Sequence, residues 1–182
     1  RNPGGVLVPQ TEKGLTGKGF EFLAEMERMH MIVDVSHLSD KGFWDIVEHG
    51  TRPFAASHSN CRALAPHTRN LTDEMIRALS ERGGIAGLNY YAPFLDTDPT
   101  HPENCRSTVE LIAKHAAHYK QVGGAQMIAL GSDFDGIDGP HQLENAAFLP
   151  LLADALRKEG FTEDEVEGIY YRNAMRFFEE NL

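Results

Sequence analysis

Basic charge is scarce in this sequence of 182 residues. It contains 17 Lys and Arg against 27 Asp and Glu, so the formal net charge is -10 and the pI is about 5.3. Binding to nucleic-acid phosphates requires a basic face, and anionic lipid surfaces attract basic segments. We therefore expect neither a nucleic-acid partner nor docking on an anionic membrane surface. The net charge does not exclude a small-molecule substrate, because its binding depends on the local charge of a pocket.

Long hydrophobic runs and cysteines are scarce too. No apolar run approaches the roughly 18 residues typical of a membrane-spanning helix. Residues 1–10 lack the basic and apolar regions of a signal peptide, and the chain opens without Met, from which we expect truncation or processing. The two cysteines, Cys61 and Cys105, are typical of free thiols in a cytosolic protein. These features predict a cytoplasmic localisation.

Short apolar segments alternate with amphipathic ones along the chain. The apolar segments predict strands at 31–37, 53–58, 85–91 and 127–134. Amphipathic spacing predicts helices after residue 16 and at about 39–49, 72–82, 107–122, 145–158 and 163–180. Ser107 with Glu110, and Thr162 with Glu165, fit capping boxes. Nearly continuous apolar strands that alternate with helices indicate a buried parallel sheet, so residues 1–182 are predicted to form one α/β domain.

The predicted strand–helix units number four, which is too few to close a (β/α)8 barrel. A half-barrel leaves two parallel edge strands with unpaired backbone groups, which favour association. Three arrangements are open at this point: other residues supply the missing half, two copies pair, or the sheet stays open in a nonstandard form. We accordingly expect a homo-oligomer or association through the open sheet edges.

Polar residues end all four predicted strands, namely His37, His58, Asn89 and Asp133. In parallel α/β folds, reacting groups gather at the carboxyl ends of the strands. Neighbouring strands lie about 4.8 Å apart, so His37 and His58 can both reach one ion at the usual Zn–N distance of about 2.0–2.1 Å. Either histidine alone is more typical of a strand-end residue bonded to backbone. The pair at matching positions predicts a metal site.

Three charged residues near these strand ends are further candidates. Asp133 either caps the turn after its strand or bonds nearby amides, or it accepts and returns a proton beside a metal-activated water. Arg69 is either a solvated or ion-paired arginine or a guanidinium fork that holds a substrate carboxylate. Asp34 alternates with His37 and is predicted to support the ligands rather than to bind metal. His67, near Arg69, is interpreted as a surface residue. The other histidines lack matched partners and are interpreted as background: His30, His49, His101, His115, His118 and His141.

Five motifs in order carry a resemblance over nearly the whole chain: MIVDVSHLS, FAASHSN, TRNLTDEM, GLNYY and ALGSDFDG. Together they resemble the renal (membrane) dipeptidase family of zinc metallopeptidases. The resemblance implies the C-terminal half of a (β/α)8 barrel, made of four parallel βα units plus a C-terminal helix. It also implies a site for two zinc ions, and hydrolysis of dipeptides and related amides.

The resemblance assigns roles to four residues. His37 and His58 match ligands of the second zinc, Arg69 matches the arginine that contacts the substrate carboxylate, and Asp133 matches the aspartate beside the bridging water. The family's N-terminal His-x-Asp pair, its bridging glutamate and a substrate-facing histidine have no counterpart, so this chain is expected to supply ligands for one zinc only. Zinc-dependent dipeptide hydrolysis is the expected function. A different metal-dependent amidohydrolase and an inactive half-barrel fragment that folds or associates without turnover are the alternatives.

Overall fold

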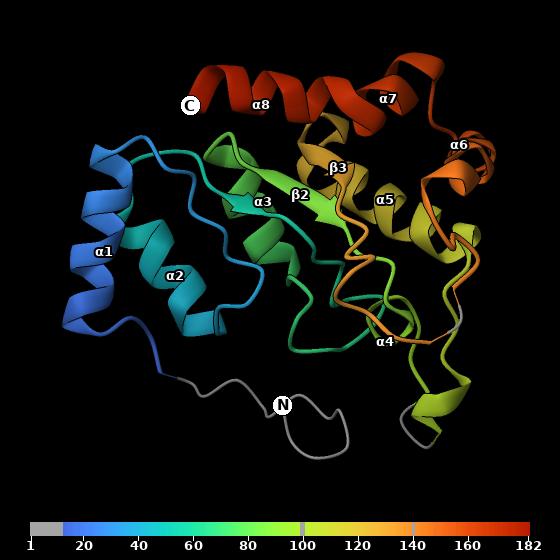
Figure 1. The fold of residues 1–182 in the computed structure, drawn as a ribbon, viewed down its shortest axis with the longest axis horizontal. Coiled ribbons are helices and arrows are strands. Elements are labelled where there is room, and N and C mark those ends of the chain that lie inside the picture. The colour runs from blue at the N-terminus through green and yellow to red at the C-terminus, as the bar shows by residue number, and fades with distance from the viewer. Residues whose placement is uncertain (1–12, 99–100, 140) are drawn as a thin grey trace.

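A small parallel sheet forms the centre of the fold in a computed structural model, which describes residues 13–98, 101–139 and 141–182. The strands β1 (Ala55–Ala56), β2 (Ile85–Leu88) and β3 (Ile128–Leu130) lie in the order β1-β2-β3. Both strand pairs are parallel, with Ala56 opposite Ala86 and Ala86 opposite Ile128. The predicted α/β class with a parallel sheet is confirmed (Figure 1).

The strand predicted at 31–37 is wrong as a strand. Its pairing with β1 is limited to an isolated bridge between Asp34 and Ala55, supported by bonds from Val35 N to Ala55 O and from Ala55 N to Val33 O. The chain then turns, because Leu38 N donates to Val35 O at 2.9 Å. The turn places His37 directly beyond the paired residues, so the pairing with β1 ends before this polar residue. The other three strands are present but shorter than predicted.

Helices follow the predicted segments. The longer ones are α1 (Gly17–Arg28), α2 (Asp40–His49), α3 (Asp73–Glu81), α5 (Val109–Gly123), α6 (Leu149–Lys158) and α8 (Asn173–Asn181). Shorter elements are α4 (Ala92–Leu95), α7 (Glu163–Glu167), the 3-10 turns η1 (Pro102–Asn104), η2 (Ala125–Met127) and η3 (Ala146–Phe148), and the π-helical η4 (Gly168–Arg172). The predicted helix at 163–180 is therefore continuous but contains a π-helical turn.

The two predicted capping boxes have opposite outcomes. Thr162 and Glu165 form a complete box at the start of α7. The box at Ser107 is wrong, because Thr108 caps α5 by accepting a bond from Leu111 N at 3.3 Å. The Ser107 hydroxyl instead donates to the carbonyl of Tyr90 at 2.6 Å, and thereby ties the start of α5 to the segment that follows β2.

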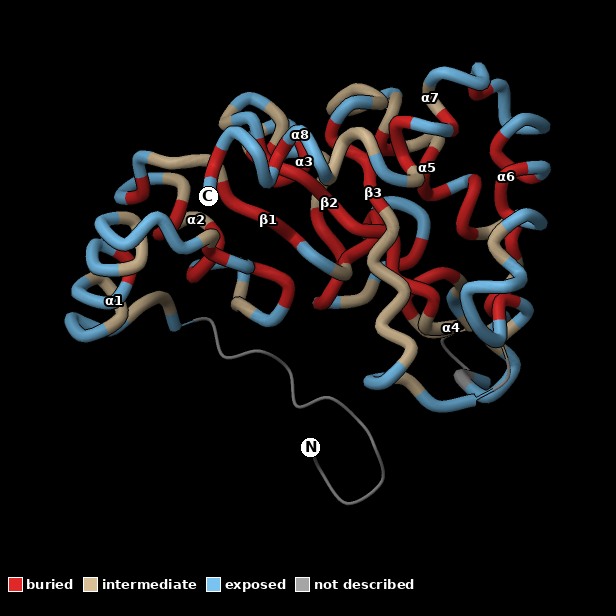
Figure 2. Tube along the Cα trace, turned by 45° about the horizontal axis from the view of Figure 1, so that its top comes forward, coloured by how far each residue is buried: buried red, intermediate tan, exposed pale blue. Residues whose placement is uncertain are grey.

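Alternate strand residues face two different layers. Ala56, Ala86 and Ile128 pack into the main core with side chains of α2, α3 and α5. Ala55, Ile85 and Ala129 face the other way and are covered by α8, whose Phe177 is 2% exposed. Figure 1 shows α8 running along one side of the sheet, and Figure 2 shows buried backbone concentrated along the strands. The sheet is thus covered on both faces, while the carboxyl ends of its strands lead into loops.

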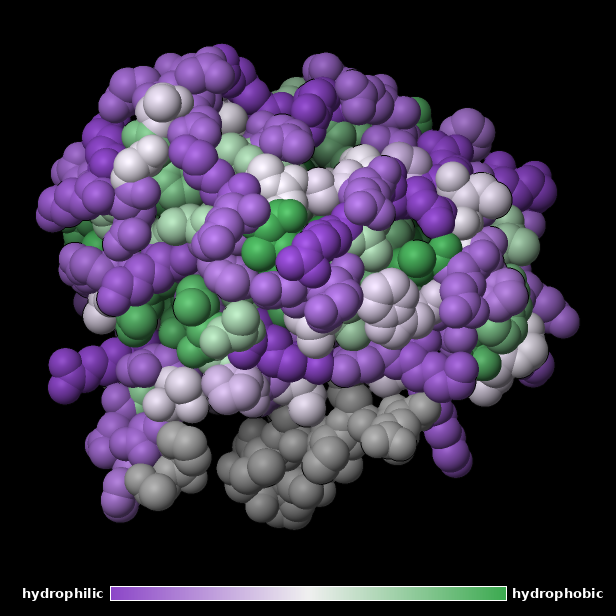
Figure 3. Space-filling model, turned by 180° about the vertical axis from the view of Figure 1, so that it is seen from behind, coloured by the Kyte–Doolittle hydropathy of each residue, from purple (hydrophilic) through white to green (hydrophobic). Residues whose placement is uncertain are grey.

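The surface is mostly hydrophilic on the side opposite to Figure 1, with hydrophobic side chains in separate patches (Figure 3). Within residues 13–98, 101–139 and 141–182, none of the helices has the length and apolar character needed to cross a membrane.

Candidate metal centre

His37 and His58 converge, as predicted from their strand-end positions. Their Nε2 atoms lie 2.8 Å apart, and the ring centres are 4.9 Å apart. Two imidazole nitrogens bound to one tetrahedral zinc are about 3.3 Å apart, given Zn–N distances of about 2.0–2.1 Å. A small rotation of either ring would therefore bring both nitrogens to the spacing that a shared ion requires.

The charge state of both histidines suits metal binding. Burial lowers the pKa of His37, and the nearby Arg69 guanidinium lowers it further. Burial followed by Arg69 also lowers the pKa of His58. Each ring is thereby biased toward the neutral form, which carries the lone pair that a metal ion needs. The Asp133 and Asp34 carboxylates act in the opposite direction on both rings, which places these charges close to the pair.

Arg69 is buried at this site rather than solvated, with 6% of its surface exposed. Its Nε donates to the carbonyl of Ser36, and its Nη2 donates to the carbonyl of His58 at 3.4 Å. The guanidinium carbon lies 5.2 Å from the centre of the Phe94 ring. Arg69 therefore holds together the two segments that carry the paired histidines. Its Nη1 has no hydrogen-bond partner in the part of the chain that the structure describes.

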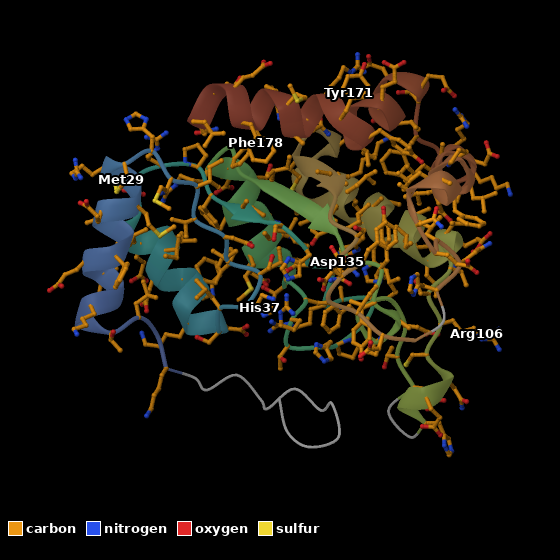
Figure 4. The ribbon with its side chains drawn as sticks, viewed as in Figure 1. Met29, His37, Arg106, Asp135, Tyr171 and Phe178 are labelled. Carbon is orange, nitrogen blue, oxygen red and sulfur yellow. The ribbon has the colours of Figure 1, made fainter. Side chains whose placement is uncertain are left out.

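Asp133 closes the turn after its strand, as one of its predicted arrangements requires, while its role in proton transfer stays a prediction. Its carbonyl accepts a bond from Gly136 N at 2.9 Å and closes the turn after β3. Its backbone has a φ of 62°, in the left-handed region that few residues other than Gly, Asn and Asp adopt. Its Oδ2 accepts a bond from Asn89 Nδ2 at 3.1 Å, so the side chain is oriented by the end of β2. In Figure 4, Asp135, two residues on, and His37 are seen near the middle of the view, below Tyr171 and Phe178.

Three buried asparagines organise the loops around the site. The sequence indicated Asn89 as a strand-end residue, whereas Asn60 and Asn70 were missed. Asn60, Asn70 and Asn89 are all 0% exposed. Asn60 Nδ2 donates to the Asn89 carbonyl at 2.9 Å, and Asn60 Oδ1 accepts from Asn89 N at 3.1 Å. Asn70 Oδ1 accepts from Asn60 N at 3.2 Å. Because buried amides must be bonded to be stable, this network fixes the loops after β1 and β2 against each other.

His115 is a structural core residue, although its place in a predicted helix indicated only background. It is 1% exposed, its Nδ1 accepts a bond from Cys61 N at 3.0 Å, and its Nε2 lies 3.1 Å from the Leu95 carbonyl, to which it donates. Burial lowers the pKa of His115 to about 4. It therefore links the loop after β1 to α4 while neutral. Burial also raises the pKa of the Cys61 thiol, which makes Cys61 a poor metal ligand.

The lowered pKa of His115 predicts that the folded protein loses stability as the pH falls. The unfolded chain binds a proton near pH 6.5 and the folded chain near pH 4, so the contribution of His115 to stability is complete above 6.5 and decreases as the pH falls. On going from about pH 7.5 to about pH 5, we expect a loss of about 2 kcal/mol of unfolding free energy from this group. Guanidinium denaturation at both pH values measures it. His115→Gln should lose about 2 kcal/mol less over the same interval, and equal losses in the two proteins would contradict the assignment.

The candidate metal ligands are the two histidines His37 and His58, whose Nε2 atoms face each other. Among residues 13–98, 101–139 and 141–182, no group of three or more His, Cys, Asp or Glu side chains is arranged to hold a metal ion. The donor chemistry nevertheless fits zinc, since two neutral imidazoles provide part of the usual set of three protein ligands at a catalytic site. The geometry of this pair therefore allows at most two protein ligands from the described residues.

The chain is an α/β protein with a parallel sheet, and its polar site lies beyond the carboxyl ends of the strands. Enzymes with parallel α/β folds commonly place their active sites at this end of the sheet. The sequence model of the membrane dipeptidases, peptidase family M19, matches residues 4–181. The chain belongs to this family.

Individual relatives agree with the family match. A Klebsiella pneumoniae protein described as uncharacterized, in the pqqA 5' region, is 38% identical over 168 residues, which are 92% of this chain and 61% of the relative. An uncharacterized dipeptidase of Schizosaccharomyces pombe is 34% identical over 167 residues, 91% of this chain and 39% of the relative. The crystal structure of a metallo peptidase from Rhodobacter sphaeroides, liganded with a phosphinate mimic of the dipeptide L-Ala-D-Ala, superposes with a TM-score of 0.86 at 32% identity. The match covers 97% of this chain and 50% of that structure, so the chain spans about half the length of such relatives.

Proposed function

We propose that this chain is the C-terminal half of a zinc-dependent dipeptidase with a (β/α)8 barrel. The observation that carries the proposal is the convergence of His37 Nε2 and His58 Nε2 to 2.8 Å at the carboxyl ends of parallel strands. The edges of the sheet, at the segment around Asp34 that bridges to β1 and at β3, are where the remaining strands or a second copy would pair. In the intact site, which would hold two zinc ions, this half supplies ligands for one, and the other ligands come from the remaining strands.

The residues of this chain divide the work between metal, proton and substrate. A bound zinc would supply a Lewis acid that activates water and polarises the peptide carbonyl. Asp133, oriented by Asn89, takes the proton of the attacking water and returns it to the leaving amine. Arg69 faces the substrate's C-terminal carboxylate with Nη1, while its other donors hold the backbone. Support for a dipeptide substrate comes from the Rhodobacter sphaeroides relative, whose ligand mimics one.

The function is tested on the complete, zinc-loaded protein with a panel of dipeptides that includes L-Ala-D-Ala. We expect hydrolysis that a chelator abolishes and added zinc restores. A free C-terminal carboxylate should be preferred over the amidated dipeptide by about 10- to 100-fold in kcat/KM, because a charge-assisted hydrogen bond contributes about 1.5–3 kcal/mol. The absence of chelator-sensitive turnover on every dipeptide would overturn the proposal and favour the inactive half-barrel.

The anchoring role of Arg69 is separated from its structural role by a matched pair of variants. Arg69→Lys keeps the charge but loses the planar fork, so the preference for the free carboxylate should largely disappear. Arg82→Lys is the control, because Arg82 also donates to two backbone carbonyls, those of Gly50 and Val47, away from the site. The preference should persist in Arg82→Lys. If both variants lose it, the preference does not report on Arg69.

A further inference from the structure

A chain of hydrogen bonds leads from His58 away from the paired nitrogens to a carboxylate. Ser57 Oγ lies 2.7 Å from His58 Nδ1 and 2.5 Å from Asp34 Oδ2. Asp34 Oδ1 also accepts bonds from Ser57 N at 3.0 Å and Ser36 N at 3.1 Å. Three donors therefore converge on one carboxylate, which favours its ionised, acceptor-only form.

The positions of the protons follow from this arrangement. An ionised carboxylate only accepts, so Ser57 must give its single hydroxyl proton to Asp34. Ser57 Oγ then has only lone pairs left for His58, so His58 Nδ1 carries a proton and donates it. The reverse assignment would leave two acceptor oxygens facing each other at 2.5 Å. With Nδ1 protonated in the neutral ring, His58 Nε2 is unprotonated and carries the lone pair that faces His37 Nε2 at 2.8 Å.

The sheet holds this arrangement in place from the other side. Gly87 in β2 and Gly131 just after β3 both lie against the Ser57 carbonyl, and a Cβ at either position would overlap that oxygen. The backbone N–H of His58 donates to Ser36 Oγ at 3.0 Å. The backbone of residues 57–58 is thereby fixed, and the bond from Nδ1 to Ser57 sets the rotation of the His58 ring.

We propose that Asp34 and Ser57 are positioning residues that hold His58 in the Nδ1–H tautomer and aim Nε2 at the metal. A metal-binding histidine commonly donates its other ring N–H to an acceptor in this way. Here a serine hydroxyl is inserted between the ring and the carboxylate. The link to metal affinity rests on the proposed function, whereas the tautomer does not.

The tautomer is measured on the complete, metal-free protein labelled with 15N-histidine, with the His58 signals identified by their loss in His58→Gln. We expect a protonated Nδ1 and an unprotonated Nε2 in the wild type, and a shift toward Nε2–H in Ser57→Ala. The zinc dissociation constant, measured by competition with a chromophoric chelator, should rise about 10- to 100-fold in Ser57→Ala. Ser57→Thr keeps the hydroxyl and should stay within about threefold of the wild type.

Ser59→Ala is the matched control, because Ser59 follows His58 directly and its buried Oγ has no hydrogen-bond partner in the described part of the chain. It should change neither the tautomer nor the zinc affinity. An Nε2–H tautomer of His58 in the wild type would overturn the proposal, as would an unchanged tautomer or an unchanged zinc dissociation constant in Ser57→Ala. If the complete protein binds no zinc and hydrolyses no dipeptide, the proposed function fails, and the tautomer spectra alone decide the role of Ser57.

Discussion

Replacing either His37 or His58 with Ala is expected to remove one zinc ion from the complete enzyme and to lower kcat/KM by at least about 10³-fold. The reason is that the remaining imidazole cannot hold the ion at the spacing that the pair provides. A catalytic metal contributes several kcal/mol of transition-state stabilisation, and about 4 kcal/mol corresponds to roughly 10³-fold in rate. Zinc content per protein and kcat/KM on the best dipeptide measure the effect.

The double variant sharpens this prediction. Two ligands of one ion act as a unit, so removing both should cost little more than removing one. His49→Ala is the control for the loss of a histidine. His49 is the last residue of α2, a helix of 10 residues that begins shortly after His37. It therefore lies about 15 Å along the helix axis from the start of α2. Its zinc content and activity should match the wild type. Full zinc content in both single variants would contradict a shared ion at His37 and His58.

The fold class was predictable because its signals are local. The apolar segment at 85–91 and the capping box at Thr162 and Glu165 depend only on neighbouring residues. The first contains the strand Ile85–Leu88, and the second is complete. Strand length was not predictable, because it depends on where the chain must turn. The segment at 31–37 has the composition of a strand, yet the bond from Leu38 N to Val35 O ends its pairing with β1.

The convergence of His37 and His58 was predictable because parallel strands bring equivalent positions together. What surrounds them depends on contacts between distant segments. The bond from Asn89 to Asp133 spans 44 residues, and that from Cys61 to His115 spans 54. No spacing rule reveals such pairs, although the position of His115 between Ile112 and Tyr119 on the buried face of α5 is a signal that could have indicated a core residue.

The placement of Arg69 shows how a residue assigned to substrate binding also builds the site. Its sequence context predicted either a solvated side chain or a substrate fork. The solvated alternative is wrong, because the guanidinium is buried and bonds the backbone carbonyls of Ser36, which precedes His37, and of His58. Substrate binding by Arg69 stays a prediction. A substrate carboxylate bound at Nη1 would therefore be positioned by the same group that fixes the ligand backbone.

Exchanging Asp133 for Asn is expected to lower kcat of the complete, zinc-loaded enzyme by about 10²- to 10⁴-fold, the usual contribution of a general acid–base group. Asn is the informative substitution because it tolerates the left-handed backbone, with φ of 62°, that Ala would strain. It also keeps an oxygen that can accept the bond from Asn89 Nδ2. The fold and the zinc content should be preserved, while the basic oxygen that takes the proton is lost.

Asp135→Asn is the matched control, since Asp135 is exposed and lies two residues further along the same turn. It removes the same charge from the same loop and leaves the Asp133 carboxylate in place. We expect its kcat to stay within about threefold of the wild type, compared with the loss of at least about 10²-fold in Asp133→Asn. Equal losses in both variants would assign the effect to the charge of the loop, and full activity of Asp133→Asn would show that the proton is transferred by another group. A selective loss in Asp133→Asn, with zinc content and melting temperature unchanged, would instead place the proton transfer on the carboxylate that Asn89 orients.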